Sequence, residues 1–196
     1  MVSLDDILAQ ATATKGAMYF HFRSKQALAL AIVEHQRGVL TDAVRALFAR
    51  KLSGLEALVE VAFLIAVQDT SQDVMRAALN LLESIGRSSG LQANLVGEWV
   101  KHFAIFVQRA IADGDVIDGT DPEDVSRQLV SLYLGLRQTS NLDDPRPYLG
   151  DLEQSWALAM PGFVNPDRID YFTQFIGRRT AIAVKNMPAQ PSRALQ

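Results

Sequence analysis

Apolar residues recur at helical spacing along almost the whole chain. The clearest example runs from Leu91 through Trp99 to Ala110, where apolar side chains follow one another at steps of three and four residues. No window alternates apolar and polar residues for long enough to favour a β-strand. This periodicity predicts an all-α protein of about nine helices.

Capping residues, glycines and prolines divide this pattern into separate helices. Ser24 is expected to begin a helix that ends near Leu52, because Ser53-Gly54 follows it. Asp121-Pro122 and Asn165-Pro166 are helix starts with a capping side chain and a proline in the first turn. The predicted helices cover residues 3–11, 15–21, 24–52, 55–67, 74–85, 91–111, 121–139, 148–159 and 165–185.

Composition excludes several classes of protein. The chain has 196 residues, 48% of them apolar, which is enough for a sizeable core, and it has no cysteine for a disulfide, a thiolate metal site or a nucleophile. The histidines lack the spacing of metal ligands, and no serine or glycine pattern is typical of an active site. The acidic N-terminus does not resemble a signal peptide, and the apolar runs are shorter than a membrane span. We therefore expect a cytoplasmic protein that is not an enzyme and has no cofactor, metal site or membrane partner.

Charge is distributed unevenly along the chain. Residues 1–51 hold seven Lys or Arg against four Asp or Glu, whereas the whole chain has a net charge of −3. A basic head on an acidic body is typical of a nucleic-acid reader with a separate partner domain. Ordinary scatter of charge would give the same numbers, so both interpretations stay open at this point.

The two short N-terminal helices and the longer one after them form a helix-turn-helix pattern. Ile7 and Leu8 of the first helix can pack against Met18 and Phe22 of the second, because Met18 and Phe22 lie four residues apart on one face. The opposite, small and polar face of the second helix is then free to enter a major groove. A helical hairpin that serves only as scaffold remains the alternative.

The stretch Thr14-Lys15-Gly16-Ala17-Met18-Tyr19-Phe20-His21-Phe22-Arg23-Ser24-Lys25-Gln26-Ala27-Leu28 closely resembles the recognition helix and the following helix of TetR-family transcriptional regulators. The resemblance implies a homodimer that binds double-stranded operator DNA, with a ligand-binding, dimerising all-α body after the head. It also implies which side chains contact the DNA. The residues that would face bases are Lys15, Gly16, Ala17, Phe20 and His21, and those that would hold phosphates are Thr14, Tyr19 and Lys25.

Glu98-Trp99 and the stretch 156–163 are similar to one branch of that family, the γ-butyrolactone autoregulator receptors. In that branch the tryptophan of the central helix lines a pocket for a small, mainly apolar effector, here one that resembles a γ-butyrolactone. Gln68, Ser131 and Gln138 are the candidate polar anchors. An aromatic stripe can equally be plain core. The residues expected to line the pocket are Phe63, Val67, Leu79, Leu82, Trp99, Phe103, Leu132 and Tyr133.

The resemblance predicts three parts of the chain: a DNA-binding head over 1–35, a ligand-binding and dimerisation domain over 36–187, and a disordered tail over 188–196. The candidate dimer interface is formed by the helices 121–139 and 165–185, through Leu136, Phe172, Phe175 and Ile176, although these residues could also be core. One departure from the family is that its first helix, which precedes the helix-turn-helix, is missing. The prediction is a ligand-responsive DNA-binding regulator, most simply a repressor. The alternative is a ligand-binding or heterodimerising protein that has lost DNA binding through N-terminal truncation.

Overall fold

The computed structural model describes residues 22–24, 27–28, 30–32, 35, 50–71, 75–76, 79–80, 83 and 90–187. The helices bounded there are α4 (Gly54–Ser71), α6 (Leu91–Ala112), α7 (Pro122–Thr139), α8 (Pro145–Ala159) and α9 (Ile169–Lys185), with 3-10 turns at Met160–Gly162 and Pro166–Arg168. Within these residues the only extended pairing is an isolated bridge between Val116 and Val164. The all-α prediction is confirmed for the part of the chain that the structure describes.

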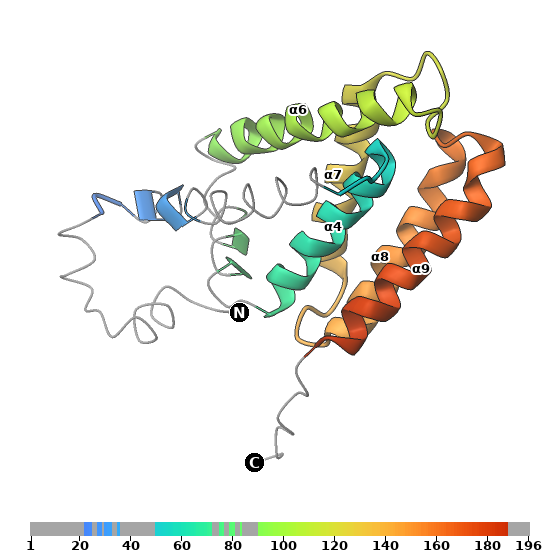
Figure 1. The fold of residues 1–196 in the computed structure, drawn as a ribbon. Helices are drawn as coiled ribbons and strands as arrows, with labels where there is room; N and C mark the ends of the chain where they lie inside the picture. Colours follow the sequence, from blue (N-terminus) through green and yellow to red (C-terminus); the bar gives the residue numbers. More distant parts are fainter. Residues whose placement is uncertain are drawn as a thin grey trace.

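Helix α4 is the centre of the body. It packs against α6 on one side and against α8 and α9 on the other, as Figure 1 shows. It is buried on most of its faces, and within Leu55–Val61 every residue except the half-buried Glu56 is buried. A helix that is apolar on every face is stable in water only when neighbours cover all of those faces. The composition of α4 therefore accounts for its central place.

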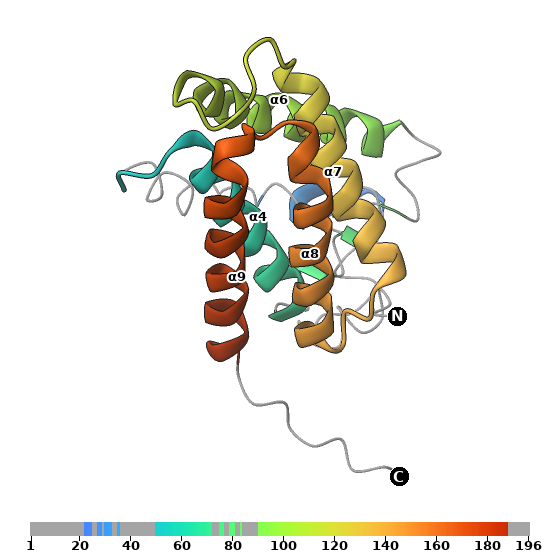
Figure 2. The same ribbon diagram turned by 90° about the vertical axis from the view of Figure 1, so that its right-hand side faces the viewer.

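Helices α8 and α9 lie side by side and form an outer layer of the body (Figure 2). Phe172 and Ile176 of α9 are buried in the same core cluster as Tyr148 and Trp156 of α8. Helix α6 crosses one end of the molecule and packs most extensively against α7 and α4. The described body thus has one continuous core around α4. Helix α6 covers this core at one end, and α7, α8 and α9 cover its sides.

The expected capping of α7 is confirmed, and α4 has a cap that sequence reasoning missed. The Asp121 side chain accepts from the backbone N–H groups of Glu123 and Asp124, at 2.7 and 3.2 Å. Ser53 and Glu56 form a capping box, in which each side chain accepts from the other residue's backbone N–H. Ser53-Gly54, interpreted from the sequence as the break after a helix ending near Leu52, also begins the next helix, α4.

Other expected boundaries shift by a few residues. Helix α8 begins at Pro145 rather than at 148, because proline fits the first turn of a helix. Asn165 does not cap α9. Its side chain instead donates to the backbone oxygens of Gly114 and Val116, at 2.6 and 3.2 Å. A 3-10 turn then leads into α9. Gly114, expected to follow α6, does so with a φ of 77°.

The residues predicted to be exposed at a dimer interface are not exposed. Phe172 and Ile176 are fully buried, while Leu136 and Phe175 pack partly buried against the core. The alternative that they are core residues is confirmed. On the outer layer, the exposed large apolar side chains are instead those of Leu158 on α8 and of Tyr171 and Ile182 on α9.

Several predictions fall outside the described residues and stay predictions. These are the two short N-terminal helices, the tail over 188–196 and most of the predicted head. Ser24, which is described, begins its helix as expected, since its side chain and backbone oxygens accept from the N–H groups of Ala27 and Leu28. No helix of the described part of the chain is long and apolar enough to cross a membrane.

Candidate ligand-binding site

Five of the eight predicted pocket residues belong to the main core of the described body or pack against it. Phe63 is 1% exposed and belongs to the core, and the other four pack partly buried against it. The five residues come from α4, α6 and α7. The four partly buried residues are Val67, Phe103, Leu132 and Tyr133.

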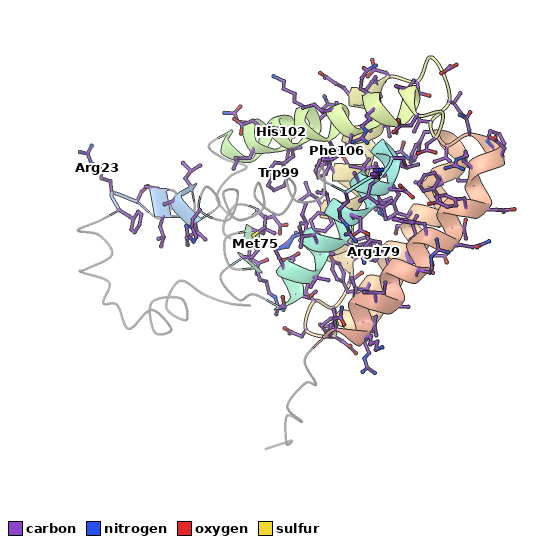
Figure 3. All side chains as sticks on the ribbon, in the orientation of Figure 1. Arg23, Met75, Trp99, His102, Phe106 and Arg179 are labelled. Atoms are coloured by element: carbon purple, nitrogen blue, oxygen red, sulfur yellow. The ribbon has the colours of Figure 1, made fainter. Side chains whose placement is uncertain are left out.

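Trp99 lies apart from that cluster. It packs partly buried against Leu95 of the same helix, together with Leu30 and Ile32 from the segment that begins at Ser24. Figure 3 shows Trp99 and Phe106 on the side of α6 that faces the rest of the body. Leu79 is buried, and Leu82 lies outside the described residues. The tryptophan and the segment that follows the predicted DNA-binding residues therefore pack against the same residue, Leu95.

A buried ion pair joins α4 to α7 beside the predicted pocket. The Arg137 Nη1 atom lies 2.7 Å from Asp69 Oδ2, and both side chains are almost completely inaccessible to solvent. Arg137 also donates to Glu83 Oε1 and to Asn80 Oδ1, at 3.3 and 3.1 Å. Each buried charge is thus compensated by an opposite charge and by hydrogen bonds, which is the condition for keeping charges in a core.

Two tyrosines complete this polar cluster. The Tyr133 hydroxyl donates to Asp69 Oδ2 at 3.0 Å. Burial raises the pKa of Tyr133 and of Tyr148, and the negative charge of Asp69 raises both further. Burial also raises the pKa of Asp69, against the opposing effects of Arg137 and of the hydrogen bond from Tyr133. At neutral pH both tyrosines therefore remain protonated hydrogen-bond donors.

Three polar atoms in this region are buried without a hydrogen-bond partner: Gln68 Oε1, Asp69 Oδ1 and the Tyr148 hydroxyl. The Asp69 carboxylate accepts two hydrogen bonds at Oδ2 and none at Oδ1. The hydroxyl groups of Tyr133 and Tyr148 lie close enough together for each to perturb the pKa of the other. Buried polar groups are nearly always satisfied in proteins, so such atoms need an explanation.

Sequence reasoning missed Asp69, Arg137 and Tyr148. Of the anchors it named, Gln68 is buried, whereas Ser131 and Gln138 are exposed, and Gln138 donates to Glu83. The signal was present for Asp69, which lies three residues after Ala66 and on the same apolar stripe. An acidic side chain on a helix face that packs into the core needs a cationic partner there. The spacing of residues in α4 does not indicate which cation this is, because that depends on how α7 packs against α4.

A surface hollow of about 480 Å³ lies elsewhere, between α6 and the start of α7. It contains none of the predicted pocket residues, and its lining is Lys101, Ala104, Ile105, Gln108, Asp121, Pro122 and Glu123. Within the described residues, no group of three or more His, Asp or Glu side chains could hold a metal ion. The predicted DNA-binding residues 14–17, 19–21 and 25 lie outside the described part of the chain.

Comparison with known proteins finds similarity to bacterial regulators. Residues 1–32 match the sequence model of a family described as bacterial regulatory proteins, tetR family. The A-factor receptor protein of Streptomyces griseus is 27% identical over 166 residues, which are 84% of this chain and 57% of that protein. The chain thus spans little more than half the length of this curated relative.

Solved structures match over most of the chain. A γ-butyrolactone receptor described as an ArpA-like protein is 28% identical, with a TM-score of 0.72 over 92% of this chain and 86% of that one. The TetR-family protein CprB of Streptomyces coelicolor, solved in complex with its biological operator sequence, is also 28% identical. Its TM-score is 0.71 over 91% of this chain and 86% of that one.

Proposed function

We propose that the chain is a ligand-responsive, DNA-binding transcriptional regulator of the TetR family of bacterial regulatory proteins. In its finer form the proposal is a homodimeric repressor that a small, mainly apolar effector of the γ-butyrolactone class releases from its operator. The whole-chain similarity to a relative solved on its operator carries the proposal. The motif at 14–28 supports it, because it lies within residues 1–32, which match the family model.

The proposal assigns two sets of residues to two tasks. The DNA set is Thr14, Lys15, Gly16, Ala17, Tyr19, Phe20, His21 and Lys25, and the ligand set is Phe63, Val67, Leu79, Leu82, Trp99, Phe103, Leu132 and Tyr133. Small residues at the N-terminus of a recognition helix allow close approach to base edges, and basic and hydroxyl side chains bind phosphates.

Contacts between the head side of the chain and α6 support coupling of the two tasks. Trp99 packs in one cluster with Leu30 and Ile32, which follow the DNA set by only a few residues. At the other end of α6, Arg109 donates to the backbone oxygen of Leu52 at 2.6 Å. An effector that binds beside Trp99 would move the head through these contacts.

Release from DNA then follows from a shift in population. Two recognition helices of a dimer bind operator half-sites when they lie about 34–36 Å apart, one turn of DNA. The effector can oppose this only if it binds more tightly to a form of the body with a different spacing. The contacts of α6 with residues 30, 32 and 52 are the ones expected to differ between the two forms.

A mobility-shift titration with the gene's own upstream DNA tests the proposal. We expect specific binding whose affinity falls steeply with salt, with a slope of about −0.9 per phosphate contact on a log–log plot. Alkyl γ-butyrolactones should release the DNA. Absence of any DNA binding, together with mixed dimers with an intact relative, would favour the heterodimerising alternative. If neither DNA binding nor mixed dimers are observed, the remaining interpretation is a ligand carrier without regulatory partners.

A pair of variants on α6 separates ligand response from DNA binding. We expect Trp99→Ala to weaken release by the lactone while leaving operator affinity unchanged, because Trp99 is not among the residues assigned to DNA contact. His102→Ala is the matched control, since His102 is exposed three residues further along the same helix. Equal release in Trp99→Ala and in the parent would remove Trp99 from the ligand set.

A further inference from the structure

The start of α4 is fixed to the end of α6 by side chains of α6 and of the residue that follows it. Asp113, directly after α6, accepts at Oδ2 from the backbone N–H of Gly54 at 2.7 Å. Arg109, in the last turn of α6, donates to the backbone oxygen of Leu52 at 2.6 Å, and its Nε lies 3.6 Å from Asp113 Oδ2. The two helices are therefore joined where the chain enters α4.

The end of α6 is fixed in turn to the segment that precedes α9. The backbone oxygen of Asp115 accepts from the N–H of Asn165, and the N–H of Ile117 donates to the oxygen of Phe163, both at 2.9 Å. Arg168 Nε donates to Asp115 Oδ1, also at 2.9 Å, and the Asp115 side chain is buried. Three hydrogen bonds thus join the connection after α6 to the one before α9.

The first turn of α9 is fixed back to the first turn of α4. The Tyr171 hydroxyl donates to the carboxylate of Glu56. The guanidinium of Arg168 lies 4.7 Å from the centre of the Tyr171 ring, which helps to orient that ring. The other carboxylate oxygen of Glu56 accepts from the N–H of Ser53 at 2.7 Å in the capping box of α4. One carboxylate therefore binds both α9 and the residue that begins α4.

These contacts form a closed ring of three helix ends: the start of α4, the end of α6 and the start of α9. The three ends lie at one corner of the body, at the upper right of Figure 1. Each end is bonded to both of the others, so none can shift without breaking hydrogen bonds. One turn further along α4, Glu60 pairs with Arg179 of α9 at 2.8 Å. Networks of this kind transmit a displacement from one rigid helix to another.

The ring connects two parts of the chain that have different tasks in the proposed regulator. Helix α9 belongs to the outer layer, whose exposed apolar side chains offer a surface to a second copy. Leu52 and Ser53 are the point at which the chain from the predicted head reaches the body. We propose that the contact between Tyr171 and Glu56 positions the head relative to this layer, and thereby determines which spacing of operator half-sites the dimer accepts.

This inference rests on the proposed function, because half-site spacing has meaning only for a dimer that binds DNA. Tyr171 and Glu56 are positioning residues, and neither belongs to the DNA set or the ligand set. One base pair added at the centre of an operator moves the half-sites about 3.4 Å further apart and rotates one relative to the other by about 35°. A rigidly connected head cannot follow this change, whereas a loosely connected one can. A symmetric dimer contains two rings, so one substitution loosens both.

The test compares three DNA duplexes: the operator fragment mapped by footprinting in the gene's upstream DNA, the same fragment with one base pair added at its centre, and a single half-site. The spacing penalty is the ratio of the Kd for the lengthened fragment to the Kd for the natural one. We expect about tenfold in the parent, comparable to one mismatched base pair. Tyr171→Phe should lower it about threefold or more through loss of a hydrogen bond to a charged group, with half-site affinity unchanged.

Two further variants show whether the effect belongs to this contact. Thr173→Val removes an exposed hydroxyl two residues further along α9, whose partner is the backbone oxygen of Ile169 in the same helix. It should keep the penalty of the parent. In the Tyr171→Phe background, Glu56→Gln should change nothing more, because the contact is already lost and glutamine retains the capping box. A further fall in the penalty would contradict the assignment of Glu56.

A penalty below about twofold in the parent, or an unchanged penalty in Tyr171→Phe, would overturn the proposal. So would a Tyr171→Phe protein that sediments as a monomer where the parent is a dimer, because the hydroxyl would then serve dimerisation itself. Equal losses of half-site and operator affinity would place the defect in the head and would also refute it. Failure of the parent to bind any of the three duplexes would instead refute the proposed function, and this inference with it.

Discussion

Asp69 is an acid within a helix that is buried on almost every side, and it is retained there because Arg137 lies 2.7 Å away. Removing a charge from water costs several kcal/mol, which a close opposite charge and hydrogen bonds offset. The guanidinium also donates to Glu83 and Asn80, so the pair ties α4 and α7 to the segment between α4 and α6. The Arg137 side chain thus connects three parts of the predicted ligand-binding domain.

Loss of Arg137 is expected to be costly because it leaves the Asp69 carboxylate buried and uncompensated. We expect Arg137→Met to lower the free energy of unfolding by about 3–5 kcal/mol at neutral pH. The double variant Asp69→Asn/Arg137→Met should be more stable than Arg137→Met alone, since the remaining side chain is neutral. Asp143→Asn, at an exposed ion pair with Arg76, should cost less than about 1 kcal/mol. Urea denaturation measures all three, and a double variant no more stable than Arg137→Met would contradict the account.

The raised pKa of Asp69 makes part of the stability depend on pH. Burial raises the pKa above its ordinary value of 3.8, so the folded state binds this proton more tightly than the unfolded state does. The resulting contribution is fully present below that value and is lost as the pH rises through the folded pKa. Relative to Asp69→Asn, the parent should therefore lose stability as the pH rises from about 4. Denaturation of both proteins across this range checks the sign, and a constant difference would show that the shift is absent.

At the scale of elements, the contact between α4 and α6 is set by the first residue of α4. A Cβ atom on Gly54 would lie 2.3 Å from Ala110 N and 2.5 Å from Phe106 O, both backbone atoms of α6. The Gly54 N–H also donates to Asp113 Oδ2 at 2.7 Å. Glycine is needed here for close approach of two backbones, and not for an unusual backbone conformation.

A methyl group at this position must push the two helices apart. We expect Gly54→Ala to lower the free energy of unfolding by about 1–3 kcal/mol and to alter coupling between lactone and operator. Gly135→Ala is the matched control, because Gly135 lies within α7 with open space around it. There alanine should raise stability by up to about 1 kcal/mol through its helix propensity. Equal effects of the two substitutions on chemical denaturation would mean that the helices do not approach this closely in solution.

At the scale of the whole molecule, the layer of α8 and α9 leaves one face open on the described body (Figure 2). Leu158 on this layer is 74% exposed and Ile182 is 45% exposed, while the aromatic residues of α9 point into the core or pack on each other. Since one recognition helix contacts too few base pairs for specific binding, the proposed function needs a second copy of the chain. This layer is the proposed interface.

A charge on the outer layer should prevent dimerisation. We expect Leu158→Glu to sediment as a monomer at micromolar concentration and to lose operator affinity, while its circular dichroism stays that of the parent. Ile105→Glu is the control, because Ile105 is 61% exposed but lies on α6, beside the surface hollow. A Leu158→Glu protein that remains a dimer would place the interface on another face.

Local sequence determined the secondary structure of the described body and where most of its helices begin and end. Apolar spacing predicted α4, α6, α7, α8 and α9, and Asp121 and Gly114 marked ends that the structure confirms. These signals work because capping and the burial of one face depend on residues a turn apart. They did not identify the capping box of Ser53 and Glu56, although α4 begins within one residue of the expected position.

Tertiary structure decided which side chains meet across helices. Phe172 and Ile176 became core rather than interface, Trp99 joined Leu30 and Ile32 rather than the aromatic cluster, and Asp69 met Arg137, 68 residues away. Helical periodicity tells which face of a helix is apolar, but not which neighbour covers it. That choice depends on how whole helices pack together, because the free energy of burial is shared among all of them.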